Sequence, residues 1–444
     1  MFLESIKIQA FRSLYDVTFQ PGQFTVLAGP NNAGKSTLAQ ALHFLGETHL
    51  LGLEYAISRN GGYENVAHRR VRRTKQPVAF EVDARLRYRE VSTLRREVMT
   101  NRMPTEEFRA RYGVSRREFD PELRVTHSFS FKALGEAIES DFSVLDESAK
   151  VQYLEADGSE YQTAFRLHRG PDDIAVESQF AKLGEDPIWR RLVSPLSRDE
   201  FLRFYGDTAS PTGLVATTLG FNPVLRHFGQ ALGSVQLLQL NPLECRLPGS
   251  PTPNAELGQH GSNLPALVAH MMRTSPEAWS RTLDAMRSIL PGLLDIRTTF
   301  TPDRRLAVQF VEKGGGRPWT SEEVSDGTIQ SLALFLALYD TRRRLIVIEE
   351  PENSLHPWIV RAFVDACRDA RNKQIILTTH SPALLTYLRP EEVTLIWRRE
   401  GRTQVRPLVE IDPEAERLWS EGAVNVFDIL DGGFLRESVP EGFV

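Results

Sequence analysis

The segment from Gly29 to Thr37, "GPNNAGKST", combines two glycines with a lysine and two hydroxyl side chains at fixed spacing. It matches the pattern G-x-x-x-x-G-K-[S/T], whose backbone N–H groups curl around a β-phosphate. In that pattern Lys35 reaches the β- and γ-phosphate oxygens and the Ser36 hydroxyl binds Mg²⁺. The segment therefore predicts a nucleoside triphosphate site, without choosing between ATP and GTP. The expected contacts are Asn32, Gly34, Lys35, Ser36 and Thr37.

Two adjacent acids end another apolar run, "LIVIEEPENSLHP". Carboxylates at the C-terminal end of a strand lie where doubly wound sheets bind ligands. We expect Glu349 to hold Mg²⁺ through a water molecule, and Glu350 to orient and deprotonate the attacking water. The metal position is usually Asp in P-loop NTPases, but an outer-shell contact tolerates the extra methylene of Glu. The alternative is a pair of solvated acids at a strand end.

A histidine ends the next apolar run, "ILTTHSP". This His380 follows Glu350 by 30 residues, and we expect it to contact the γ-phosphate and sense its loss. A purely structural histidine is the alternative. His356, in the loop after the two acids, is interpreted as a capping or surface residue more than as a catalytic one.

The stretch "VSDGTIQ", Val324 to Gln330, has turn chemistry but runs directly into the apolar segment "SLALFLALY". A turn that feeds a helix N-terminus can bind an anion, because free N–H groups and the helix dipole point out of it. Ser325 and Gly327 are therefore candidate anion contacts. The alternative is a core helix that Ser325 simply caps.

These groups are carried by alternating strand and helix patterns, which predict an α/β domain. The expected strands are "SIKIQAF", "QFTVLAGP", "VAFEVDARLRYRE", "VQLLQLNP", "RLAVQFVE", "RRLIVIEEP" and "KQIILTTHSP"; the expected helices are residues 35 to about 45, "NLPALVAHMMRT", "WSRTLDAMRSIL" and "WIVRAFVDACRDA". Because the pieces lie at both ends of the chain, the middle is predicted to be an insertion. The expected domains are an N-terminal lobe (1–90), an inserted basic helical or α+β domain (91–234), a C-terminal lobe (235–411) and a tail (412–444).

The composition is that of an ordinary globular protein, with 41% hydrophobic and 25% charged residues among 444. The sequence has neither a run of 18 apolar residues nor an N-terminal signal-peptide pattern, so we expect a cytoplasmic protein with no membrane partner. Cys245 and Cys367 have no metal-ligand spacing.

Charge is unevenly distributed along the chain. Residues 68–117 hold 15 Lys and Arg against 6 Asp and Glu, a net +9 in a chain whose overall charge is −5. Basic residues interleaved with Phe108, Tyr112 and Phe119 would suit the backbone of DNA or another nucleic acid, recognised largely without regard to sequence. A dock for an acidic protein and a plain solvated face are the alternatives.

The chain carries four motifs in this order: "GPNNAGKST", "VSDGTIQ", "LIVIEEPENSLHP" and "TTHSP". Together they resemble the ABC-type ATPase heads of the RecF/SMC-like group. The closest likeness is to prokaryotic AAA-family ATPases of the OLD and defence-system kind. "FRS" and "GSNLPALVAHM" resemble further stretches of that group, so the likeness covers roughly 1–90 and 235–411. It implies an α/β P-loop NTPase head of ABC type, with a mixed or parallel sheet interrupted by a large α+β insertion.

The resemblance implies that Ser325 and Gly327 bind the γ-phosphate of ATP held by a second copy of the chain. Asp326 departs from the commoner Gly of such signature turns, although Ser-Asp-Gly is familiar in the defence-type branch. The loop Gln that usually helps to bind Mg²⁺ cannot be placed, since Gln76 is a poor candidate. Sustained heptads for coiled-coil arms are absent, and the tail is too short for the Toprim nuclease domain of OLD nucleases.

The leading functional hypothesis is therefore an ATPase that forms a head-to-head homodimer, or a higher assembly, around ATP and Mg²⁺. It would act in DNA repair or anti-phage defence with DNA, an effector protein such as a nuclease, or both. The alternative is an ATP-dependent switch or scaffold that holds a separate nuclease or toxin with little turnover. A transport ATPase is disfavoured by the basic insertion, and a self-contained nuclease by the lack of a metal-nuclease constellation.

Overall fold

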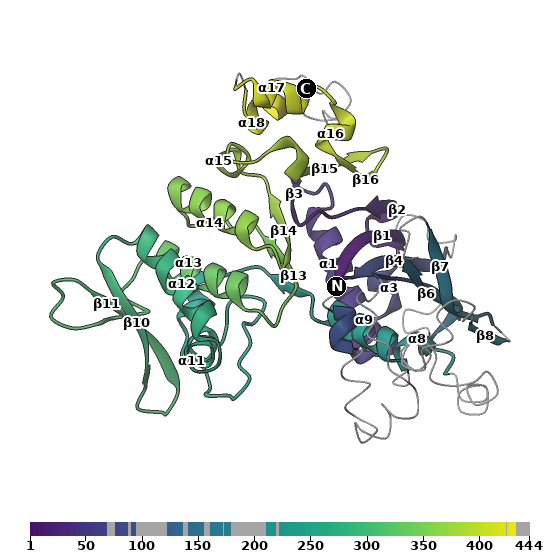
Figure 1. Ribbon diagram of the computed structural model, residues 1–444, viewed down its shortest axis with the longest axis horizontal. Coiled ribbons are helices and arrows are strands. Elements are labelled where there is room, and N and C mark those ends of the chain that lie inside the picture. The colour runs from purple at the N-terminus through teal and green to yellow at the C-terminus, as the bar shows by residue number, and fades with distance from the viewer. Residues whose placement is uncertain are drawn as a thin grey trace, which may run out of the picture. The chain divides into compact units, whose positions relative to one another are not determined.

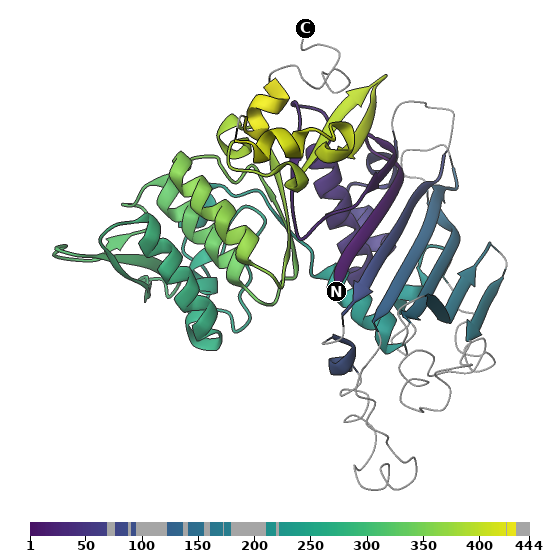
Figure 2. The ribbon, with the colours of Figure 1, turned by 45° about the horizontal axis from the view of Figure 1, so that its top comes forward.

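The computed structural model gives two compact units, Met1–Pro21 with Ala41–Gly233 and Gly22–Gln40 with Ser234–Val444 (Figures 1 and 2). The residues that the structure describes are 1–68, 76–87, 90–94, 122–135, 141–154, 160–171, 173–178, 210–218, 222–422 and 424–431. None of the helices in these ranges has the length and apolarity that a membrane crossing requires.

A six-stranded sheet runs through the second unit in the order β16-β15-β3-β14-β13-β9. Its strands are β3 (Phe24–Ala28), β9 (Gln236–Leu238), β13 (Leu345–Glu349), β14 (Gln374–Thr379), β15 (Val393–Arg399) and β16 (Arg402–Pro407). Only the β15–β16 pair is antiparallel in this sheet. Strands β3, β13 and β14 are buried at every residue, which is why they are encoded by largely apolar runs. The predicted α/β fold with a mixed sheet is confirmed.

The second unit also contains helices and a small sheet of order β10-β11-β12. These elements are α10 (Pro242–Arg246), α11 (Leu264–Thr274), α12 (Pro276–Ile289), β10 (Leu293–Phe300), β11 (Leu306–Glu312), β12 (Trp319–Thr320), α13 (Asp326–Tyr339), α14 (Pro357–Asp369), α15 (Pro382–Leu385), the 3-10 helix η1 (Pro390–Glu392), α16 (Leu408–Ile411), α17 (Ala415–Ser420) and α18 (Val426–Asp431). Helix α13 is buried at every residue from 328 to 338. A helix that is apolar all round must be enclosed, and α13 lies beside α12 and α14 (Figure 1).

Helix α1 (Lys35–Leu51) extends beyond the residue near 45 where we expected it to end. Its residues from Ala41 onward belong to the first unit, where Phe44, Leu45 and Thr48 are buried. Packing therefore maintains the helix through Gly46, which has low helix propensity. The helix ends before Gly52, whose φ of 95° suits glycine.

The first unit contains an antiparallel sheet of seven described strands in the order β2-β1-β4-β5-β6-β7-β8 (Figure 2). They are β1 (Phe2–Phe11), β2 (Leu14–Phe19), β4 (Val78–Leu86), β5 (Leu123–Ala133), β6 (Phe142–Leu154), β7 (Tyr161–Arg169) and β8 (Ile174–Ser178); the helices are α2 (Leu53–Arg59), α3 (Tyr63–Val66), α8 (Val215–Thr218) and α9 (Pro223–Gly233). Because β4 pairs with both β1 and β5, the sheet passes without a break from the expected lobe 1–90 into the expected insertion. The domain boundaries themselves stay a prediction.

The long strands β5 and β6 were not recognised from the sequence, although their residues alternate between buried and half-exposed positions. Their buried positions include His127 and Glu147, both fully buried, so the apolar period is interrupted. A buried polar group must find partners inside the protein, which a sequence pattern does not reveal.

His127 and Glu147 belong to a buried hydrogen-bonded chain in the first unit. His49 contacts the Leu45 carbonyl oxygen through Nδ1 (2.8 Å) and His127 through Nε2 (2.9 Å), and His127 contacts Glu147 (3.2 Å). Burial lowers the pKa of His49 to about 3, so this ring is neutral and donates to the Leu45 carbonyl oxygen through Nδ1.

The Glu147 carboxylate also accepts hydrogen bonds from the backbone N–H groups of Val215 and Ala216, each at 2.7 Å. We expect Glu147→Gln to lower the free energy of unfolding by about 3–5 kcal/mol, because it removes the carboxylate that faces the buried Arg169 side chain at 4.0 Å and turns an amide N–H donor toward the backbone N–H groups. Urea unfolding of the whole chain measures the change, and Glu177→Gln on the exposed side of β8 is the matched control. Equal stability of the two variants would contradict this account of the core.

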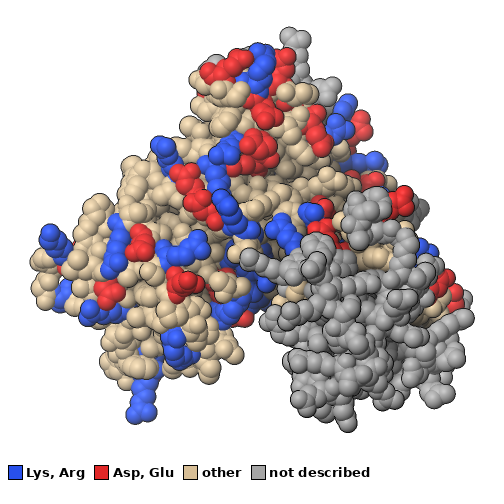
Figure 3. Space-filling view, in the orientation of Figure 1, with Lys and Arg blue, Asp and Glu red and all other residues tan. Residues whose placement is uncertain are grey.

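The basic segment 68–117 lies mostly outside the described residues, which include only 68, 76–87 and 90–94 of it. Its proposed contact with nucleic acid stays a prediction. On the face shown in Figure 3, basic and acidic side chains of described residues lie interspersed over the second unit. Ion pairs such as Arg368–Glu392 and Arg417–Glu414 belong to that unit.

Candidate functional site

The phosphate-loop residues lie between β3, which ends at Ala28, and α1, which begins at Lys35. Two positions admit only glycine. A Cβ on Gly29 would stand 1.9 Å from the carbonyl oxygen of Ile396, and one on Gly34 would stand 2.7 Å from the Thr403 hydroxyl at a φ of 117°. The loop is therefore pressed against β15 and β16, which fixes its course.

The Lys35 ammonium is folded over its own loop. It donates hydrogen bonds to the carbonyl oxygens of Gly29 (2.6 Å) and Pro30 (3.0 Å), and the side chain is buried. Burial lowers the pKa of Lys35, while the carboxylates of Glu350, Glu352 and Glu349 oppose that shift. The loop thus holds a positive charge at the place where a phosphate group would lie. Of the other expected contacts, Asn32 is exposed with a φ of 63°, and Thr37 lies half-buried in the first turn of α1.

The first expected acid meets the loop directly. The Ser36 hydroxyl donates a 2.6 Å hydrogen bond to the carboxylate of Glu349, although 313 positions separate the two residues. Burial raises the pKa of Glu349, with Glu350 adding to the rise and Ser36 opposing it. A hydroxyl and a carboxylate oxygen are the hard donors that Mg²⁺ prefers, so the residues present fit this metal.

The second expected acid and the expected histidine are also brought together. Glu350 follows β13 with a φ of 46°, and its backbone N–H donates to the Thr378 carbonyl oxygen. One carboxylate oxygen lies 2.9 Å from Nδ1 of His380, and the other accepts a 3.1 Å bond from the Asn353 amide. Both oxygens of Glu350 are therefore oriented, as a general base requires.

A third carboxyl group, Glu352, was not predicted. Its carboxylate accepts a hydrogen bond from the Thr379 hydroxyl. The same hydroxyl accepts a hydrogen bond from the backbone N–H of Ser381, so the residues on both sides of His380 take part in these bonds. The other oxygen, Oε2, is buried and has no hydrogen-bond partner among the described residues. Burial raises the pKa of Glu352. The only sequence signal was an additional acid within "EEPE".

The signature turn precedes α13, as expected. The Ser325 hydroxyl accepts a 3.1 Å hydrogen bond from the backbone N–H of Thr328 and lies 2.9 Å from the Thr328 hydroxyl, so Ser325 caps the helix. Gly327 approaches the next loop closely, because a Cβ there would lie 2.8 Å from the Ser354 carbonyl oxygen. The capped helix fits the structural alternative and leaves the phosphate role open.

The sequence favours a capping or surface role for His356 and makes Gln76 a poor candidate for binding Mg²⁺. His356 occupies the N-cap position of α14, but its side chain makes no capping hydrogen bond. Gln76 belongs to the first unit, where its amide donates to the Tyr15 hydroxyl. Neither observation supports a catalytic or metal-binding role for these two residues.

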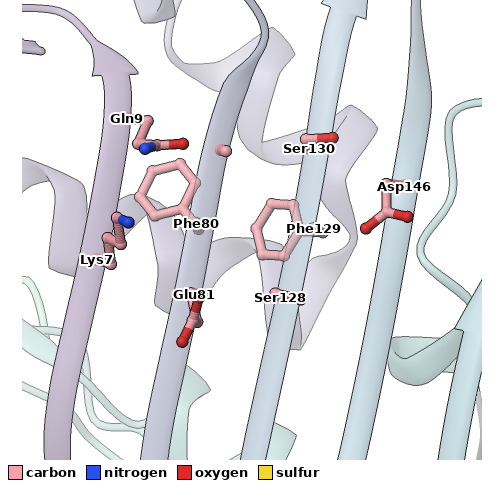
Figure 4. Close-up of a pocket in the computed structure, with 9 residues that line it drawn as sticks. Lys7, Gln9, Phe80, Glu81, Ser128, Phe129, Ser130 and Asp146 are labelled. Atoms are coloured by element: carbon pink, nitrogen blue, oxygen red, sulfur yellow. The ribbon is translucent and has the colours of Figure 1, made fainter. Parts of the chain in front are cut away.

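A separate hollow of about 130 Å³ lies on the antiparallel sheet of the first unit (Figure 4). Its charged groups are Lys7 from β1, Glu81 from β4 and Asp146 from β6, with Ser128 and Ser130 of β5 between them. With two carboxylates and one lysine, the hollow carries more negative than positive charge, which would repel a polyphosphate. The phosphate loop is the better candidate for a nucleotide.

Comparison with known families gives a match over residues 24–386 to the family described as "AAA domain, putative AbiEii toxin, Type IV TA system". No curated protein matches the chain. Similar solved structures include an Smc head bound to the C-terminal winged-helix domain of ScpA, at 12% identity and a TM-score of 0.47, with 91% of this chain and 97% of that chain covered.

Two further SMC heads have named sources. The head from Thermotoga maritima is 11% identical, with a TM-score of 0.38 and coverage of 92% of this chain and 99% of that one. The head with an extended coiled coil from Pyrococcus furiosus is 12% identical, with a TM-score of 0.41 and coverage of 95% and 100%.

We expect Glu350→Gln to retain nucleotide binding but to lower ATP turnover by at least ~100-fold, the lower end for loss of a general base. Phosphate release and equilibrium binding measure the two quantities separately. Glu391→Gln, an exposed acid of the same unit, is the control. Turnover near the wild-type rate would show that Glu350 is not the base.

Proposed function

We propose that this chain, which belongs to the AAA domain family of the AbiEii, type IV toxin–antitoxin kind, is an ATPase that works as a dimer of two heads. The observation that carries the proposal is the Ser36–Glu349 hydrogen bond beside the Glu350–His380 pair. It gathers a metal-ligand set and an oriented base at the C-terminal ends of neighbouring parallel strands, where ligands bind in such sheets.

The proposed binding step uses the phosphate loop. Backbone N–H groups of the loop and the N-terminus of α1 would surround the β-phosphate, and Lys35 would turn from its loop carbonyls to the β- and γ-phosphate oxygens. Ser36 and Glu349 would hold Mg²⁺, which neutralises phosphate charge when bound. The burial of Lys35 and Glu349 supports this, because both side chains lack bulk water as a partner.

In the proposed chemical step, a water oxygen forms a bond to the γ-phosphorus, and the bond from that phosphorus to the bridging oxygen of ADP breaks. Glu350 takes the water proton, and the products are ADP and inorganic phosphate. His380 and Asn353 hold the two oxygens of Glu350, so the base does not have to be oriented during the reaction. His380 is exposed and would contact the γ-phosphate on its outer side.

The dimer is supported by the signature turn. Ser325 and Asp326 are exposed at the N-terminus of a fourteen-residue helix whose dipole favours an anion. The hydroxyl of Ser325 is engaged with Thr328 of its own turn and not with the phosphate loop. We propose that the γ-phosphate of a second copy of the chain docks here, so that each site is completed by the partner's turn.

For the biological role, the family description supports defence more than a general housekeeping task. We propose that turnover times the action of an effector protein, with DNA as a further partner through the basic segment 68–117. A switch that holds an effector with little turnover is the competing function. It predicts ATP-dependent assembly without appreciable phosphate release.

The composite site can be tested by mixing two inactive variants. Lys35→Ala weakens ATP binding but leaves the signature turn intact, whereas Ser325→Arg binds ATP but blocks the turn. Each should be nearly inactive alone, and the mixture should recover part of the ATPase activity, well below half, through one repaired site.

Ser420→Arg, an exposed serine at the end of α17, is the control for a surface arginine and should retain activity. Full activity of Ser325→Arg alone would contradict the composite site. So would a rate that stays proportional to protein concentration down to clearly monomeric protein.

A further inference from the structure

The aspartate that replaces the commoner glycine in the signature turn has an arginine partner. Arg246, the last residue of α10, places Nη2 on Oδ1 of Asp326, the first residue of α13. We propose that Arg246 is a positioning residue, which holds the signature turn and cancels the charge of Asp326 so that the turn can receive a second copy's γ-phosphate. This inference rests on the proposed function.

The guanidinium is held at more than one point. Nη1 of Arg246 donates to the carbonyl oxygen of Ser321, and the Ser321 hydroxyl donates back to the carbonyl oxygen of Arg246 at 3.0 Å. Ser321 is buried, so the reciprocal pair ties the C-terminal end of α10 to the segment that leads into the turn. Arg246 therefore acts on the turn from both sides, through Ser321 before it and Asp326 within it.

Helix α10 provides a fixed base for this arginine. Asn241 caps the helix by accepting a 3.0 Å bond from the backbone N–H of Leu243, and Pro242 occupies its first turn. Cys245, next to Arg246, is fully buried, and a Cβ on Gly261 would stand 2.1 Å from its sulfur atom. This tight packing leaves little freedom for the end of α10.

Exposure shows where the charge acts. The Arg246 side chain is 15% exposed and that of Asp326 is 59% exposed, so the carboxylate lies on the open side of the turn beside Ser325. A carboxylate in the first turn favours its own helix, but it repels an incoming triphosphate. With Arg246 paired to this carboxylate, the turn keeps the favourable interaction of Asp326 with its helix, while the repulsion of an incoming triphosphate is reduced.

The alternative is an ordinary exposed ion pair, which contributes little to stability. The two accounts predict different results for a double variant that lacks both the Arg246 and the Asp326 side chain. If Arg246 only adds a contact, removing Asp326 as well cannot restore function. If Arg246 cancels a repulsive charge, removal of that charge should offset its loss.

The test uses Arg246→Ala, Asp326→Ala and the double variant of the full chain. We expect Arg246→Ala to weaken ATP-dependent dimerisation and lower kcat by about tenfold, the effect of roughly one uncompensated charge. Binding of ATP by the monomer should be unchanged, and the double variant should recover most of the loss. Arg417→Ala, which removes an exposed ion pair on α17, is the matched control. A double variant no better than Arg246→Ala would overturn the charge-cancelling role.

Amide hydrogen exchange of the ATP-free chain separates this inference from the proposed function. Arg246→Ala should speed exchange at Thr328 and Ile329, whose N–H groups bond within the turn. If the wild type dimerises with ATP and Arg246→Ala matches it in dimerisation and exchange, the inference alone is wrong. If the wild type does not dimerise with ATP, the proposed function is wrong and the docking role falls with it. Faster exchange would then still confirm that Arg246 holds the turn.

Discussion

The hydrogen bond from Ser36 to Glu349 joins the phosphate loop to a strand 313 residues later, and it depends on the parallel order of the central sheet. Strands β3, β14 and β13 run in one direction, so all three deliver their C-terminal ends to one edge. The loop, the two acids and His380 meet there because each lies at or directly after the C-terminal end of one of these strands. An antiparallel neighbour at β14 would have sent His380 to the opposite edge.

Several ionisable side chains of the site are buried, which is unfavourable for their charged forms. Lys35, Glu349 and Glu352 all have pKa values shifted toward their neutral forms by burial. Hydroxyl groups of Ser36 and Thr379, and not cations, are the direct partners of the two carboxyl groups. Such an arrangement suits a ligand that brings its own charges, as a polyphosphate with a divalent cation does.

The loop after β13 contacts both the signature turn with its helix α13 and the Glu350–His380 pair of the same chain. On one side, the Pro351 carbonyl oxygen accepts a bond from Gln330 of α13, and Ser354 lies against Gly327. On the other side, Glu350 contacts His380. The signature turn and Glu350, the proposed catalytic base, are thus both in contact with the same short segment, so a shift of this segment would move both.

The sequence alone determined the phosphate loop, the buried parallel strands, the acids and the histidine at their ends, and the AAA-family relationship, which the family match confirms. These follow from local patterns: spacing, hydrophobic period and position at a strand end. The structure brings together Ser36 with Glu349 and Glu350 with His380, while their catalytic roles stay a prediction.

Only the tertiary structure revealed Glu352 with Thr379, Arg246 with Asp326, and the buried His49–His127–Glu147 chain. The Arg246–Asp326 pair is separated by 80 positions, and polar side chains in β5 and β6 interrupt the apolar period that would have marked those strands. The physical reason is common to all three. A buried or clamped polar group is stabilised by a partner that the fold supplies from elsewhere in the chain, and no local pattern encodes which partner that is.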